Sequence, residues 1–112
     1  MRTTTGSRFA GRPAKRLTFV ISVHDRVGHG RLEVELVKRA RKAKLAGATV
    51  FEGREGYGAS GHVHREHLLS DDRPLAVVVI DRPDKIEEFL DEVAHLLDGV
   101  LVAVAEIEVL DT

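Results

Sequence analysis

The spacing of apolar residues in this chain changes from the period of a strand to the period of a helix, and it does so twice. Residues 17–23 place apolar side chains at every second position, which is typical of a strand with one buried face. Residues 31–45 place them three and four apart instead, with acidic residues early and basic residues late, which suits the helix macrodipole. The same order of a strand followed by a helix is predicted a second time, with a strand at 75–80 and a helix that begins at Pro83 and reaches Leu97.

Two further strands complete the predicted order of elements. Residues 48–52 form a short β-branched run, and residues 100–110 end in an alternation of Ile and Val with Glu. We expect Gly47 to cap the first helix in the left-handed conformation and Gly99 to end the second helix. The order β–α–β–β–α–β consists of two split βαβ halves, which predicts an α+β, ferredoxin-like fold with both helices on one face of an antiparallel four-stranded sheet.

The face of this sheet that the helices leave uncovered is also predicted to be apolar. It would carry Val20, Val78 and either the pair Val102 and Val104 or the pair Ala103 and Ala105. A patch of this kind is too apolar to be left in water, so we expect an oligomer that buries it.

Composition excludes several classes of protein. The chain has 112 residues, the size of one domain, and contains no cysteine, which excludes a disulfide scaffold, a zinc ribbon, an iron–sulfur site and thiol catalysis. The longest apolar run, residues 75–80, is far shorter than the roughly 20 residues of a membrane helix. We therefore expect no membrane insertion and a cytoplasmic protein.

Basic residues are concentrated at the N-terminus. Residues 1–15 are polar, aperiodic and free of acidic residues, and we expect them to form a disordered basic arm before a single domain at 16–112. The remainder of the chain is net acidic and has no interleaved aromatic residues. Nucleic acid is therefore not expected as the ligand, because its binding depends on phosphate neutralisation.

Residues 53–74 form a connection that is too long for a hairpin, and connections of this length are commonly functional. Within it, the stretch from Gly56 to Gly61 has the spacing G-x-G-x-x-G. A dinucleotide fingerprint would open a helix inside a βαβ unit, whereas this one leads into an antiparallel neighbour, so a Rossmann site is rejected. Glycines here would instead let backbone N–H groups approach a ligand closely.

Three stretches of the chain resemble domain-of-unknown-function family 190, a PII-like group. They are HDRVGHGRL at 24–32, GATVFEGREGYGASGHVH at 47–64 and RPLAVVVIDRPDKIEEFL at 73–90. The resemblance covers about residues 16–110, and its most specific part is the GYGASG block.

The resemblance implies a homotrimer of ferredoxin-like subunits that acts as a signalling protein. Its long connection would be equivalent to the PII T-loop and would act on an unidentified partner protein, a membrane transporter or an enzyme. The base of that loop would help to bind a small-molecule effector, with an adenine nucleotide as the candidate, in the cleft between subunits. The chain departs from PII proteins in that residues 97–100 contain no phosphate-binding lysine and residues 108–112 contain no arginine.

The predicted ligand site combines the glycine block with the loop after the first strand. It comprises Gly56, Tyr57, Gly58, Ala59, Ser60, Gly61, His24, Asp25 and Arg26. The glycine block would present backbone donors, and Arg26, Arg54 or Arg65 could offset anionic charge.

Histidines offer an alternative from another class of function. His62, His64 and His67 follow the glycine block, and imidazole suits zinc, copper or nickel, with Asp25 or Glu66 as an added ligand. This alternative is a metal-binding trimer similar in architecture to CutA proteins. We expect no enzyme, because Ser60 and the His24–Asp25 pair lack a strained elbow or an oxyanion motif.

Overall fold

The computed structural model describes residues 8–56 and 73–112 of the chain. In chain order its elements are β1 (Gly11–Ser22), β2 (Arg26–Val27), β3 (Gly30–Arg31), α1 (Leu32–Lys42), β4 (Gly47–Glu52), β5 (Pro74–Asp81), α2 (Pro83–Val93), the 3₁₀ helix η2 (Ala94–Leu96) and β6 (Leu101–Leu110).

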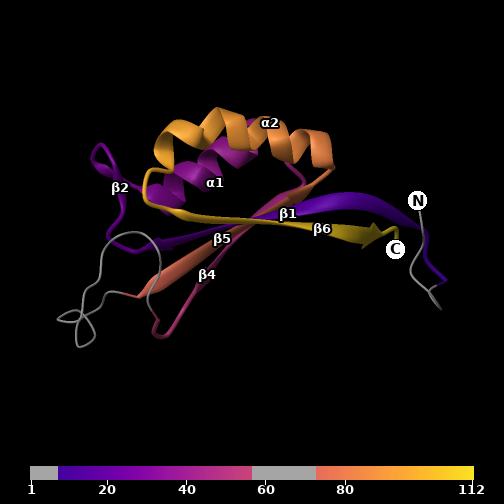
Figure 1. Cartoon of the computed structure of the whole chain (residues 1–112), viewed down its shortest axis with the longest axis horizontal. Coiled ribbons are helices and arrows are strands. Elements are labelled where there is room, and N and C mark those ends of the chain that lie inside the picture. The colour runs from indigo at the N-terminus through magenta and orange to yellow at the C-terminus, as the bar shows by residue number, and fades with distance from the viewer. Residues whose placement is uncertain (1–7, 57–72) are drawn as a thin grey trace.

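Four strands form one sheet in the order β4-β5-β1-β6, and every neighbouring pair is antiparallel. Strands β2 and β3 form a separate small hairpin between β1 and α1. Both long helices lie on the same face of the large sheet (Figure 1). The predicted α+β, ferredoxin-like fold is confirmed. The small hairpin is an addition that the sequence pattern did not indicate.

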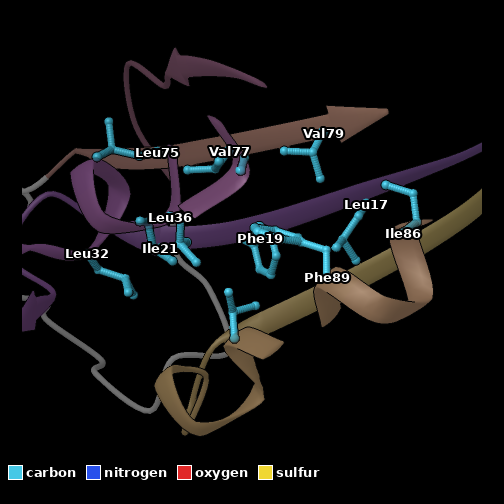
Figure 2. Packing of buried hydrophobic residues seen from close by; sticks show 12 residues of the cluster. Leu17, Phe19, Ile21, Leu32, Leu36, Leu75, Val77, Val79, Ile86 and Phe89 are labelled. Atoms are coloured by element: carbon cyan, nitrogen blue, oxygen red, sulfur yellow. The ribbon is translucent and has the colours of Figure 1, made fainter. Parts of the chain in front are cut away.

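The core lies between the sheet and the two helices. Alternate residues of β1 and β5 point at the apolar stripes of α1 and α2, as the two periods predict (Figure 2). At its centre Phe19 and Phe89 are buried and meet edge to face, with ring centroids 6.4 Å apart and an interplanar angle of 74°. The buried apolar cluster comprises Leu17, Phe19, Ile21, Leu32, Leu36, Ala40, Leu75, Val77, Val79, Ile86, Phe89 and Val93.

The strand registers decide which residues lie on the uncovered face. Thr18 stands opposite both Val78 and Ala103, so these side chains share the face away from the helices. The alternative with Ala103 and Ala105 is therefore the one that occurs. Val102 lies on the helix side, where it packs against the core.

Strand β1 begins earlier than predicted. Residues 11–15, which we expected within a disordered arm, pair with β6, and Arg12 Nε contacts Asp111 Oδ1 at 2.8 Å. The expectation was wrong for these residues because β6 is long enough to offer them backbone partners. Residues 1–7 of the expected arm lie outside the described residues.

The C-terminus of α1 also differs from the prediction. Lys44, with φ of 61°, adopts the left-handed conformation that we assigned to Gly47. The N–H of Leu45 donates to the carbonyl of Ala40, and the N–H of Lys44 to that of Arg41, which together form a Schellman motif. Gly47 is instead the first residue of β4. Gly99 does take a positive φ, of 75°, after η2.

Candidate functional site

The predicted site residues that the structure describes lie at one end of the large sheet. Ile21 of β1 pairs with Leu75 of β5, which pairs with Glu52 of β4, and Val20 pairs with Leu101 of β6. The segments that continue beyond these pairs must therefore share that end, where the β2–β3 hairpin and the last residues of β4 are seen (Figure 1). We call this region the loop end, and define it as residues 22–31, 53–56, 73–74 and 97–100.

The base of the long connection is held closed by backbone contacts. The N–H of Gly53 donates to the carbonyl of Pro74 at 2.8 Å, and a Cβ at Gly53 would lie 2.8 Å from the Pro74 ring. Only glycine therefore permits this close approach without a shift of the proline. Arg73 Nη1 contacts Glu52 Oε1 at 2.9 Å across the same base. Gly56 follows with φ of +156°, in the region that favours glycine.

The loop after β1 is equally well fixed. Asp25 holds it at both ends: its Oδ2 accepts a hydrogen bond from the N–H of Ser22 at 2.9 Å, and its carbonyl accepts one from Leu32 at 2.9 Å. Gly28 has φ of 59° at the first position of the two-residue turn between Val27 and Gly30, as a type II′ hairpin requires. One carboxylate oxygen of Asp25 thus shapes the loop, while the side chain of Arg26 lies exposed on the hairpin.

A buried acid lies beside this hairpin. Glu33, in the first turn of α1, is only 6% exposed, and its Oε2 contacts Arg31 Nη2 at 2.6 Å. Its Oε1 is buried and has no hydrogen-bond partner in the described part of the chain. Sequence reasoning assigned Glu33 only to the helix macrodipole. The available signal was its place beside Leu32 and Leu36, at the border of the apolar stripe.

The structure brings His24, Asp25, Arg26 and Gly56 to the loop end. The rest of the predicted ligand site, from Tyr57 through Gly58, Ala59 and Ser60 to Gly61, lies outside the described residues, as do His62, His64 and His67. Residues 8–56 and 73–112 contain no group of three or more potential metal ligands. The metal alternative, which depends on the three later histidines, stays a prediction.

Two carboxylate contacts that shift a pKa lie outside the loop end. The hydrogen bond from Lys15 to Glu87 raises the pKa of Lys15, against the opposing effect of burial. The hydrogen bond that Arg39 donates to Glu35 lowers the pKa of that carboxyl group.

A groove of about 670 Å³ runs between α1 and the start of β4. It contains none of the predicted site residues, and the start of β4 is at the end of the sheet opposite the loop end. Its lining residues are Val34, Val37, Lys38, Ala40, Arg41, Leu45, Gly47 and Ala48. Within the described ranges no helix is long and apolar enough to cross a membrane.

Comparison with known proteins identifies relatives of this fold and sequence. The model of the family DUF190, described as an uncharacterized ACR family, matches residues 14–109. A UPF0166 protein of Aquifex aeolicus (strain VF5) is 35% identical over 77 residues, which cover 67% of this chain and 72% of that protein.

Solved structures give the same result for the fold. CPII, a nitrogen regulatory PII-like protein from Thiomonas intermedia K12 bound to ADP, AMP and bicarbonate, superposes with a TM-score of 0.67 at 17% identity, covering 90% of this chain and 92% of CPII. A PII-like protein from Thermus thermophilus superposes with a TM-score of 0.62 at 18% identity, covering 88% of this chain and 91% of that one. The chain belongs to the DUF190 family and has the PII-like fold.

Proposed function

We propose that this protein is a non-enzymatic, PII-like regulator that works as a homotrimer in the cytoplasm. A small-molecule effector binds at the loop end, in the cleft between subunits, and residues 53–74 act on a partner protein, a membrane transporter or an enzyme. One observation carries the proposal. In a PII-like sheet, the base of the long connection (residues 53–56 and 73–74) and the hydrogen-bonded loop after β1 (residues 22–31) lie at the same end.

An adenine nucleotide is the first candidate for the effector. CPII, which shares the fold, is bound to ADP and AMP in one structure and to ADP in another. In this chain Gly53 and Gly56 provide a backbone without side chains at the base of the connection. Arg54 in the same segment, and Arg26 on the hairpin at the same end of the sheet, are both exposed and supply cationic groups for the phosphates of such a ligand.

The uncovered face of the sheet supports the trimer. One cross-strand row on this face runs from Phe51 through Ala76 and Val20 to Leu101. Phe51 is 57% exposed and Leu101 43% exposed in the isolated subunit. An apolar row of this length across all four strands is typical of a surface that a second copy covers.

The proposal is tested by titrating the protein with ATP, ADP, AMP and cyclic dinucleotides, beside a panel of divalent metals, while light scattering gives the mass. We expect saturable binding of at least one nucleotide by a species of three subunits. Gly58→Val should abolish that binding, and His64→Ala should leave it nearly intact. Zinc binding that His64→Ala removes, without nucleotide binding by the wild type, would instead establish the CutA-like alternative.

A further inference from the structure

Two arginines face each other across the small hairpin. Arg26 of β2 is the register partner of Arg31 of β3, so their side chains leave the hairpin on one face, with Cβ atoms roughly 4.5–5.5 Å apart. Val27, on the other face, packs against the core cluster. The two arginine side chains therefore start from the side of the hairpin opposite Val27, and that of Arg31 reaches Glu33 of α1.

The hairpin holds the backbone of both arginines in place. The N–H of Leu32 donates to Asp25, the residue before Arg26, and the N–H of Asp25 donates to Ser22 at the end of β1. A site fixed in this way loses little backbone entropy when a ligand binds.

Like charges directly opposite each other destabilise a strand pair, so the arrangement has a cost. The structure offsets it for only one arginine. Glu33 contacts Arg31 at 2.6 Å, whereas Arg26 makes no hydrogen bond or ion pair within residues 8–56 and 73–112. The group formed by Arg26, Arg31 and Glu33 thus keeps one net positive charge on an exposed surface.

Glu33 orients Arg31 without using all of its donors. The carboxylate is buried in the first turn of α1 and cannot swing far, so it fixes the guanidinium that it contacts. A guanidinium has five N–H donors, and the side chain of Arg31 remains 45% exposed. Arg31 can therefore donate to Glu33 and to a ligand at the same time.

We infer that Arg26 and Arg31 form a clamp for an oxyanion, and that it holds the phosphate groups of the effector. The inference rests on the proposed function and adds to it the groups that bind phosphate. Guanidinium pairs suit phosphate because each can donate two parallel hydrogen bonds. The clamp lies at the loop end, in a chain whose residues 97–100 contain no lysine for this purpose.

The test compares ADP, adenosine and inorganic pyrophosphate by calorimetric titration of the wild type, Arg26→Gln, Arg31→Gln and the control Arg41→Gln. Arg41 is an exposed arginine on α1, beside the start of β4 and away from the loop end. Loss of one clamp arginine should weaken ADP and pyrophosphate about tenfold or more and leave adenosine unchanged. Arg41→Gln should bind all three as the wild type does.

The outcomes separate this inference from the proposed function. If ADP binds equally to the wild type and to both clamp variants, the clamp is wrong and the regulator proposal stands. If pyrophosphate binding depends on Arg26 but neither ADP nor adenosine binds, the clamp stands and the proposal of a nucleotide effector fails. If the wild type binds neither ADP nor pyrophosphate, both are overturned.

Discussion

Replacement of Glu33 by methionine should stabilise the protein, although it removes an ion pair. Methionine has a similar length and would occupy the same buried position in the first turn of α1. The expected gain arises because Glu33 Oε1 is buried without a hydrogen-bond partner in the described part of the chain. A buried acceptor left unpaired costs about 1–3 kcal/mol.

Two losses oppose that gain. The contact with Arg31 is worth about 0–1 kcal/mol, because the arginine is nearly half exposed and can be solvated when its partner is removed. An acidic residue near a helix N-terminus contributes about 0.3–1 kcal/mol. The balance favours Glu33→Met by about 1 kcal/mol, because the arginine that remains is exposed to water rather than buried.

The measurement is urea unfolding followed by circular dichroism at one fixed subunit concentration, because oligomerisation would make stability depend on concentration. Glu88→Met, at an exposed position of α2, is the matched control and should change the free energy of unfolding by less than about 0.5 kcal/mol. If Glu33→Met instead lowers the free energy of unfolding by about 1 kcal/mol or more relative to Glu88→Met, the unpaired oxygen of Glu33 does not carry the cost assigned to it. Glu33→Met should also weaken pyrophosphate binding, because it releases Arg31.

Three further changes test other parts of the structure. Lys44→Gly should raise the free energy of unfolding by about 0.5–1 kcal/mol, because glycine adopts the left-handed conformation without strain, and an unchanged or lower urea midpoint would contradict this. Phe51→Asp should leave the subunit folded but dissociate the proposed trimer, since the Phe51 side chain is exposed on the uncovered face, and light scattering should then give a mass closer to that of one subunit. An unchanged mass of three subunits would exclude that face as the interface. Arg39 lowers the pKa of Glu35 in the folded state. Their interaction therefore contributes its full stabilisation of the folded protein at a pH above 4.5, the ordinary pKa of a glutamate, and this contribution is lost as the pH falls through the lower folded-state pKa. The difference in the free energy of unfolding between the wild type and Glu35→Gln should therefore shrink as the pH is lowered. A difference that stays constant from neutral pH to well below pH 4.5 would contradict the lowered pKa of Glu35.

The fold could be predicted because the two periods record which side of each element is buried. The alternation at Leu17, Phe19 and Ile21 and the stripe at Leu36 and Ala40 depend only on neighbours within one element, so they can be found without tertiary contacts. The choice between Val104 and Ala103 on the uncovered face could not be made in this way. It depends on the register of β6 against β1, and a shift of one residue exchanges the two faces.

The misplaced boundaries have a different cause. Residues 11–15 are polar and contain Gly11 and Pro13, so their own propensities indicate no strand. Their backbone is ordered by hydrogen bonds to β6, which lies almost a hundred residues further along the chain. The cap of α1 was assigned to Gly47 on residue type, whereas the Schellman bonds require the left-handed residue two positions after Lys42 and leave Lys44 there.

The candidate site shows most clearly what a sequence pattern leaves out. The sequence indicates segment 24–32 through its resemblance to the family and predicts His24, Asp25 and Arg26 as ligand residues. The ion pair that the structure shows beside this segment instead joins Arg31 to a glutamate inside the next helix. Glu33 follows Leu32 directly and has the ordinary place of an acid in a first helical turn, so nothing local distinguishes a buried carboxylate from a solvated one. Burial is decided by how the hairpin folds back over α1, which the turn at Gly28 and the hydrogen bonds of Asp25 determine. The same turn places Arg26 opposite Arg31, so two residues that lie five positions apart in the sequence become cross-strand neighbours.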